Sequence, residues 1–244
     1  MEYQAHTVSG NLKKDPVILC SPSAAQALIK EGRSLVFLVR HGQTDWNLEL
    51  RLQGRENVPL NEEGIEQSKE CAKLFAEAAE RYGVNVSKIY SSPLSRAMET
   101  AEIIAKELHK RRPIPLGIFT ERNYGELSGL TLEERKERFP KGEKQAREVE
   151  SVPTTANRMK KGLADVCHAG NRQVVVVTHG GVANALFMRI TRGKIGTGKN
   201  ITVNCGVCLL AVNKAATIPL AYNLTGDVFF DYIEKLYELS PFEK

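Results

Sequence analysis

Two short apolar runs, each followed by a histidine, most constrain the fold of this 244-residue chain. The first run, residues 35–39, precedes His41, and the second, residues 174–177, precedes His179. Runs of this length that are rich in β-branched residues predict strands buried on both faces, as in parallel sheets covered by helices. Because such sheets bind ligands beyond the carboxyl ends of their strands, both histidines are candidate site residues.

Amphipathic helices are predicted between and beyond these runs. Apolar residues recur at helical spacing from Cys71 to Tyr82 and from Ala97 to Leu108. Strands alternating with helices predict a three-layer α/β/α domain with a mainly parallel central sheet. The other predicted elements are helices at 22–32, 131–139, 154–168, 182–190 and 226–238, and strands at 84–90, 114–119 and 201–212.

The chain divides into two parts by pattern. Residues 1–33 lie outside the strand and helix pattern and are predicted to be an N-terminal extension. Residues 34–244 are predicted to be one domain, because no repeat or linker interrupts them. Within this domain the charged segment 126–161 is expected to form a helical cap.

Composition limits the partners of this chain. The net charge is +5, and basic residues alternate with acidic ones, which suits a small anionic substrate and not a nucleic acid. No apolar stretch reaches the ~18 residues that a membrane span needs, and five cysteines at irregular spacing predict reduced thiols. We therefore expect a cytoplasmic protein without membrane partners, and a homodimer is compatible with the sequence. Cys205 and Cys208 form a CxxC motif inside an apolar run, where core packing is expected in preference to zinc binding.

Basic side chains follow three of the predicted strands. Arg40 and His41 follow the first, Arg96 lies in the first turn of the helix after the second, and His179 follows the valine-rich run. Parallel strands would bring these four groups to one edge of the sheet. Two guanidiniums and two imidazoles suit a compact dianion such as a phosphoryl group. An imidazole there is also a suitable nucleophile toward phosphorus.

Phosphoryl transfer from an alkyl ester also requires a proton for the leaving oxygen. Two carboxyl groups, Glu121 and Glu126, lie where the strand predicted at 114–119 gives way to the cap. A bound phosphate dianion would favour the protonated form of a carboxyl group beside it.

Four segments of the sequence together resemble the histidine phosphatase superfamily, the phosphoglycerate mutase-like proteins. They occur in the order of that family and span roughly residues 34–225. They are Arg-His-Gly-Gln-Thr-Asp-Trp-Asn (40–47), Ser-Ser-Pro-Leu-Ser-Arg-Ala (91–97), Glu-Arg-Asn-Tyr-Gly (121–125) and Thr-His-Gly-Gly (178–181).

The resemblance implies a phosphoglycerate mutase-like fold and a reaction without metal or other cofactor. It implies that His41 is phosphorylated during the reaction and that Glu121 is the proton donor, with Glu126 as the weaker candidate. The residues that it implies for binding the phosphoryl group or substrate are Arg40, Asn47, Gln53, Gly54, Arg96, Tyr124, His179 and Gly180.

Phosphatases and cofactor-dependent mutases both belong to the family that this sequence resembles. Segment 51–67 resembles the phosphatases, whereas segment 121–125 keeps the Tyr and Gly of the mutases. Leu132 replaces the Lys of the mutases, and their long insert with an Arg pair is missing between Glu121 and His179. Without the mutases' insert, water should reach the phosphohistidine.

We therefore expect a phosphomonoester hydrolase acting on a small phosphorylated metabolite. A 2,3-bisphosphoglycerate-dependent phosphoglycerate mutase is the alternative within the family. A non-catalytic module that binds phosphorylated ligands is the alternative from another class, although both histidines, both arginines and the acid are present.

Overall fold

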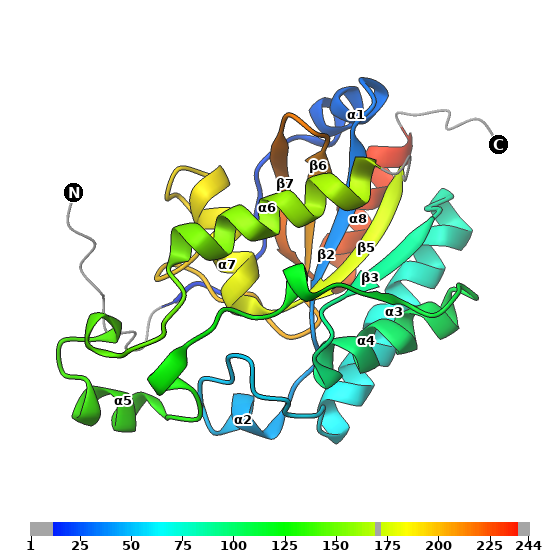
Figure 1. Ribbon diagram of the computed structural model, residues 1–244. Helices are drawn as coiled ribbons and strands as arrows, with labels where there is room; N and C mark the ends of the chain where they lie inside the picture. The colour runs from blue at the N-terminus through cyan, green and yellow to red at the C-terminus, as the bar shows by residue number, and fades with distance from the viewer. Residues whose placement is uncertain (1–11, 169–171, 239–244) are drawn as a thin grey trace.

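The computed structural model describes residues 12–168 and 172–238 and has a central sheet between two layers of helices (Figure 1). In the described residues the sheet has seven strands in the order β1-β7-β6-β2-β5-β3-β4. The strands are β1 (Val17–Ile18), β2 (Ser34–Arg40), β3 (Lys88–Ser91), β4 (Ile114–Pro115), β5 (Gln173–Thr178), β6 (Val207–Val212) and β7 (Thr217–Leu224).

Helices cover both faces of this sheet. In Figure 1, α6 and α7 lie in front of the strands and α8 lies behind them. The helices are α1 (Pro22–Lys30), α2 (Asp45–Leu48), α3 (Glu62–Tyr82), α4 (Ser95–Glu107), α5 (Leu132–Arg138), α6 (Val152–His168), α7 (Gly180–Ile190) and α8 (Gly226–Glu238). Because β2, β5, β3 and β4 are parallel to one another, the predicted three-layer α/β/α class with a mainly parallel sheet is confirmed.

Strand β2 is buried on both faces, as its uninterrupted apolar run predicts. Leu35 and Phe37 pack in the cluster that contains α3, α4 and α8, where the ring centroids of Phe37 and Phe75 are 5.3 Å apart. Val36 and Leu38 point to the opposite face and pack with α6 and α7. The alternation of side chains along one strand thus joins the two helical layers to the sheet.

The register of the parallel strands places the residues that follow them side by side. Arg40 at the end of β2 pairs with Thr178 at the end of β5. The N–H of His41 donates to the Thr178 carbonyl at 3.0 Å, and the N–H of Ser92 donates to the Val177 carbonyl at 2.9 Å. Three loops therefore start from one edge of the sheet.

Several predicted elements have different bounds in the structure. The four predicted helices from residue 131 onward are confirmed to within two residues as α5, α6, α7 and α8. The strand predicted at 84–90 is β3, and the one predicted at 114–119 is wrong beyond Pro115, where a 3₁₀ turn (Gly117–Phe119) follows β4. Strand β7 was not predicted from the sequence, since Pro219 interrupts its apolar pattern.

The prediction of a strand over 201–212 is wrong in its first half. Residues 201–206 form an irregular loop, and only Val207–Val212 is a strand. Cys205 in this loop has a φ of +57°, a left-handed conformation incompatible with a strand. Its N–H donates to the Arg40 carbonyl at 3.0 Å. A contact with a residue 165 positions earlier therefore sets this conformation.

The described part of the N-terminal segment packs on the same sheet. Strand β1 pairs antiparallel with β7, and Nε2 of Gln26 in α1 donates to the Leu236 carbonyl at 3.2 Å. The division at residue 34 stays a prediction, as does the cap at 126–161. The first part of this predicted cap, residues 126–151, lies at the lower left of Figure 1, and residues 152–161 form the start of α6. None of the helices in the described ranges is long and apolar enough to cross a membrane.

Gly64, in the first turn of α3, lets this helix approach the loop that follows His41. A Cβ at Gly64 would lie 2.0 Å from the Gln43 carbonyl oxygen, too close for any real contact. Alanine normally stabilises a helix by about 1 kcal/mol relative to glycine. Here the clash dominates, so Gly64→Ala should lower the free energy of unfolding by about 1–3 kcal/mol in urea denaturation.

The matched control for this substitution is Gly117→Ala. A Cβ at Gly117 has nothing within 4 Å, so the change should alter stability by less than about 0.5 kcal/mol. Equal stabilities of the two variants would contradict the close approach at Gly64.

Candidate active site

His41 lies directly after β2 with its side chain 3% exposed. Its Nδ1 is 2.6 Å from the Gly42 carbonyl oxygen, so this nitrogen carries the proton and donates it there. Burial, followed by the charges of Arg96 and Arg40, lowers the pKa of His41 well below 6.5. The ring is therefore neutral at pH 7, and Nε2 keeps a free lone pair.

The second histidine lies beside the first. The ring centroids of His179 and His41 are 5.1 Å apart, and Nε2 of His179 is 2.7 Å from the Ser92 hydroxyl. Burial lowers the pKa of His179 well below 6.5, and the charge of Arg96 is the next largest cause. The sheet register thus brings His41, Ser92 and His179 together from three separate strand ends.

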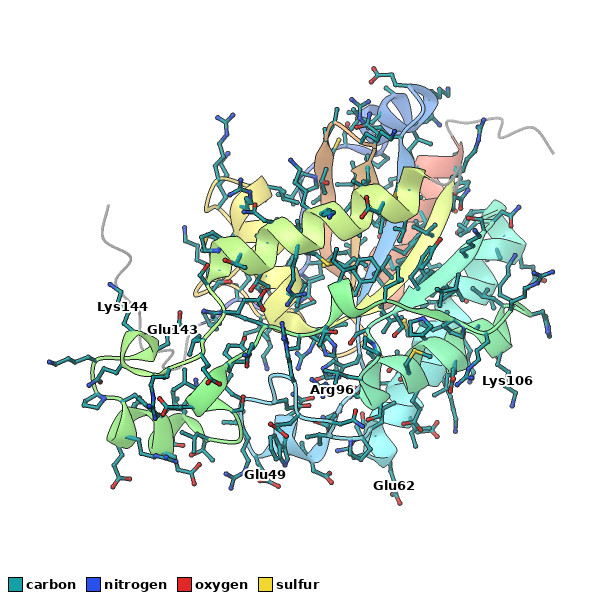
Figure 2. The ribbon with its side chains drawn as sticks, in the orientation of Figure 1. Glu49, Glu62, Arg96, Lys106, Glu143 and Lys144 are labelled. Carbon is teal, nitrogen blue, oxygen red and sulfur yellow. The ribbon has the colours of Figure 1, made fainter. Side chains whose placement is uncertain are left out.

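Two guanidiniums face this pair, that of Arg96 buried and that of Arg40 partly buried, and no carboxylate of the described residues is bound to either. Arg96 is fully buried in α4, and its Nη1 and Nη2 donate to the carbonyls of Glu56 at 2.6 Å and Gly54 at 2.8 Å. Burial lowers its pKa to about 10, which still leaves it charged at pH 7. Nη1 of Arg40 donates to the Thr202 carbonyl at 2.5 Å. Figure 2 shows Arg96 in the interior of the molecule.

Buried polar atoms without a partner are concentrated at these residues. Six such side-chain atoms occur in the described ranges, and four belong to the predicted phosphate-binding set: Arg40 Nε, Gln53 Oε1, Arg96 Nε and His179 Nδ1. An unpaired buried donor costs about 1–3 kcal/mol, so such a group normally has a partner. Oxygens of a dianion would satisfy these nitrogens and neutralise the two guanidiniums.

Glu121 is held by the start of α7. One carboxyl oxygen, Oε1, accepts the N–H groups of Arg122 at 2.7 Å and Val182 at 3.0 Å, and Oε2 accepts that of Gly181 at 3.0 Å. The three bonds fix the orientation of the carboxyl group. Two of the donors, Gly181 and Val182, follow His179 by two and three positions. Since Oε2 accepts only one N–H, it retains a lone pair that can carry a proton.

Tyr124 reaches the same point of the site. A Cβ at Gly181 would lie 2.4 Å from Tyr124 Oη and 2.7 Å from Glu121 Oε1, so both oxygens lie close to this glycine. Burial, followed by the negative charge of Glu121, raises the pKa of Tyr124. Tyr124 is therefore a neutral hydroxyl beside the candidate acid.

The remaining predicted residues line the same region. Gly180 lies against Arg40, since a Cβ there would be 3.4 Å from Arg40 Nε. Asn47 Oδ1 accepts hydrogen bonds from Thr44, and no bond within the described ranges uses its Nδ2. Gln53 Nε2 donates to Thr44 Oγ1 at 2.7 Å.

Glu126, the alternative acid, is not brought to this site. It is exposed and pairs with Arg147 at 2.8 Å, and hydrogen bonds from Arg147 lower its pKa. The geometry therefore favours Glu121.

Three site residues were not identified from the sequence. The Ser92 hydroxyl contacts His179, the Thr202 carbonyl accepts from Arg40, and Asn204 Nδ2 donates to the His41 carbonyl at 3.0 Å. Ser92 lies in a motif that was recognised, so position alone could have identified it. Thr202 and Asn204 lie in the loop mistaken for a strand, and no spacing links them to His41.

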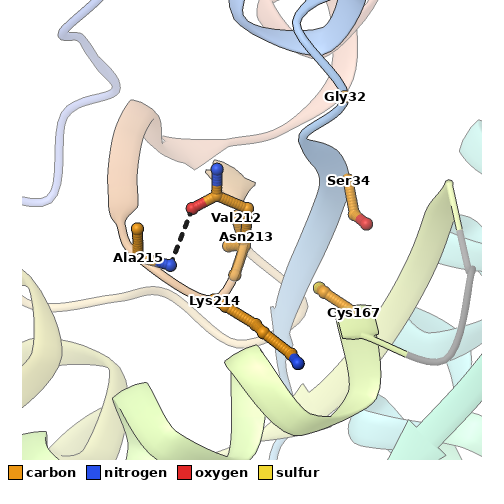
Figure 3. Close-up of a pocket in the computed structure, with 7 residues that line it drawn as sticks. All are labelled: Gly32, Ser34, Cys167, Val212, Asn213, Lys214 and Ala215. Carbon is orange, nitrogen blue, oxygen red and sulfur yellow. Dashed lines mark hydrogen bonds between the residues drawn. The ribbon is translucent and has the colours of Figure 1, made fainter.

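A cavity of about 410 Å³ lies at the other end of the sheet (Figure 3). It opens beside Ser34, the first residue of β2, whereas His41 follows the last, about 23 Å away along the strand. Cys167 lines this cavity, and burial raises the pKa of its thiol to about 11, so the sulfur is protonated and unreactive at pH 7. We assign no chemistry to it. No group of three or more metal-ligating side chains occurs in the ranges that the structure covers.

A mainly parallel α/β sheet, with two buried histidines and two arginines that bind only carbonyl oxygens of the described residues, has the arrangement expected of an enzyme that binds a phosphoryl group. The chain belongs to the histidine phosphatase superfamily (branch 1), whose sequence profile matches residues 36–225. The resemblance predicted from the four segments is thereby confirmed.

Similar proteins include named phosphatases. The uncharacterized phosphatase PhoE of Bacillus subtilis (strain 168) is 39% identical over 160 residues, which are 65% of this chain and 78% of PhoE. A metal-independent phosphoserine phosphatase of Arabidopsis thaliana is 34% identical over 191 residues, 73% of this chain and 77% of that protein. Phosphoglycerate mutases also occur among the relatives.

A solved structure shares the fold over most of both chains. Phosphoserine phosphatase from Entamoeba histolytica, in complex with 3-phosphoglyceric acid, has a TM-score of 0.64 and 26% sequence identity. The match covers 80% of this chain and 99% of that one.

Removal of Arg96 or His179 should weaken catalysis independently of the leaving group. If these side chains bind the transferring phosphoryl group, each alanine variant should lose on the order of 10²-fold in kcat/KM. Steady-state kinetics on several phosphomonoesters should give similar losses for all of them. Lys106→Ala, an exposed change on the same helix as Arg96, is the control and should stay within about twofold. Losses that differ strongly between substrates would reassign the two residues to specificity.

The two histidines should make the fold less stable in acid. Their pKa values in the folded chain lie well below 6.5, whereas in the unfolded chain they return to about that value. Below about pH 6.5 the unfolded state binds more protons, so stability falls by up to about 1.4 kcal/mol per pH unit for each histidine. Urea denaturation between about pH 7 and pH 5 should show a shallower decline for the double variant His41→Asn, His179→Asn. Equal slopes would contradict the depressed pKa values.

Proposed function

We propose that this enzyme hydrolyses phosphomonoesters of small metabolites through a phosphohistidine formed on His41. The observation that carries the proposal is the bond from His41 Nδ1 to the Gly42 carbonyl, which leaves Nε2 unprotonated beside two uncompensated arginines. A neutral imidazole among fixed positive charges is a good nucleophile toward a phosphate dianion.

The proposed reaction has two steps. In the first, the Nε2 lone pair of His41 forms a bond to phosphorus while the ester P–O bond breaks. The leaving oxygen takes the proton of the Glu121 carboxyl group and departs as an alcohol. In the second, the oxygen of a water molecule forms a bond to phosphorus while the Nε2–P bond of the phosphohistidine breaks. The water gives a proton to the Glu121 carboxylate, and inorganic phosphate leaves His41 neutral again.

The surrounding groups neutralise the charge on the phosphoryl oxygens. Arg40, Arg96 and His179 supply the donors, and their buried, partnerless nitrogens support this assignment. Asn47 Nδ2 and the Gln53–Gly54 loop are proposed to assist. Preorganised donors of this kind need no reorganisation as the charge on the phosphoryl oxygens redistributes during the transfer.

The proposed substrate is a small phosphorylated metabolite, and the natural one is not assigned. The phosphoserine phosphatases among the similar proteins support this substrate class. Mutase activity is the second candidate, favoured by the mutases among the relatives and by the retained Tyr124. Leu132 in place of the mutases' Lys favours hydrolysis. A screen of phosphomonoesters with and without 2,3-bisphosphoglycerate separates the two.

The nucleophile is tested by trapping the intermediate. Brief reaction with ³²P-labelled substrate should leave acid-labile, base-stable label on the wild type and none on His41→Ala, and this variant should lose turnover. EDTA should have no effect. Turnover that survives in His41→Ala, or that EDTA abolishes, is incompatible with the proposal. A wild type that binds phosphoesters without label or turnover would instead be a non-catalytic binding module.

A further inference from the structure

An ion pair behind the active site connects the start of α6 to the turn that carries Glu121. Arg158 and Glu150 form a two-point pair, with Nε–Oε1 at 2.7 Å and Nη2–Oε2 at 3.0 Å. Their side chains are only 19% and 11% exposed. A planar guanidinium and a carboxylate in this geometry hold each other in one orientation.

Both partners also bond to the turn at 118–123, and Glu150 Oε2 has a longer contact of 3.5 Å with Arg55 Nη2. Nη1 of Arg158 donates to the Ile118 carbonyl at 2.8 Å, and Nη2 donates to the Glu121 carbonyl at 3.1 Å. On the other side, Glu150 Oε2 accepts the N–H of Asn123 at 3.2 Å, and its own N–H donates to the Asn123 carbonyl at 2.8 Å. The pair therefore holds the main chain on both sides of Glu121.

The carboxyl group of Glu121 is itself held from the opposite direction, by the N–H groups at the start of α7. Its side chain is thus held by α7, and its main chain is held by the Arg158–Glu150 pair together with a longer bond of 3.4 Å from Arg55 Nε to the Glu121 carbonyl. An error of about 1 Å in the place of a catalytic group can cost 10²-fold in rate.

We propose that the Arg158–Glu150 pair is the positioning element for the proton donor. It keeps the Glu121 carboxyl group within reach of the leaving-group oxygen without touching substrate. This inference rests on the proposed function, because it takes Glu121 to be the acid of that reaction.

The diagnostic readout is the dependence of the rate on the leaving group. An alkoxide leaves poorly without a proton, whereas p-nitrophenolate needs little help, so a misplaced acid slows an alkyl phosphate selectively. Breaking a buried pair also lowers stability. A general loss of folded enzyme would slow both substrates equally and would leave their ratio unchanged.

The primary variant is Glu150→Gln, which keeps the size of the side chain and leaves the charge of Arg158 near His179 in place. It should lower kcat for glycerol phosphate at least about tenfold and kcat for p-nitrophenyl phosphate less than about threefold, with KM nearly unchanged for both. Glu121→Gln is the benchmark and should change the ratio in the same direction by more. Arg158→Lys keeps the charge without the two-point geometry and should fall between Glu150→Gln and the wild type.

The matched control is Glu143→Gln, which removes one carboxylate from a neighbouring pair in the same segment. Glu143 binds the guanidinium of Arg122 at 3.0 Å, and within the described part of the chain its carboxyl oxygens bond to no main-chain group of the turn at 118–123. It lies in the outer part of the segment (Figure 2). This control should leave the ratio of the two substrates unchanged.

Three outcomes would overturn the inference. If Glu121→Gln changes the ratio and neither Glu150→Gln nor Arg158→Lys does, the pair is merely structural and the proposed function stands. If Glu121→Gln leaves the ratio unchanged, Glu121 is not the acid and the inference fails with that part of the proposed function. If Glu143→Gln changes the ratio as much as Glu150→Gln, the effect is one of cap charge and not of position.

Discussion

The parallel pairing of β2 with β5 is the constraint on which the rest of the site depends. Pairing of Arg40 with Thr178 places His41 and His179 on neighbouring strand ends, with ring centroids 5.1 Å apart. Both strands are buried on both faces, so a shift of register would move every core side chain of β2 to new neighbours. The core packing of the sheet therefore also fixes the geometry of the site.

The arginines of the candidate phosphate site differ from those of the neighbouring segment in whether a carboxylate neutralises their charge. Arg96 is buried and Arg40 partly buried against carbonyl oxygens, with no carboxylate of the described residues bound to either, and burial lowers the pKa of each. Arg122, the next residue after Glu121, and Arg158, 37 positions after it, are each paired with a glutamate. Uncompensated buried charge costs stability, and the groups that carry it are those that a bound dianion would neutralise.

The sequence predicted the layers of the fold well because its strongest signals are local. Uninterrupted apolar runs at 35–39 and 174–177 and helical spacing in the intervening segments are properties of a few consecutive residues. The wrong predictions have a physical cause as well. The loop at 201–206 has the composition of a strand, but its conformation follows from bonds between Cys205 and Arg40 and between Asn204 and His41. Local propensity contains no information about such contacts.

The sequence by itself indicated which groups could carry the chemistry. His41 and His179 directly follow strands, Arg40 ends one, Arg96 lies in the first turn of a helix, and Glu121 follows the turn after β4. Only the tertiary structure decided the protonation state of His41 and the orientation of Glu121. The neutral form of His41 requires burial beside two arginines, and the orientation of Glu121 requires α7 on one side and Arg158 with Glu150 on the other. Apart from Arg40, which is adjacent to His41, these partners lie 29 to 61 positions away in the chain, and burial and hydrogen bonding between such distant residues exist only once the sheet has formed.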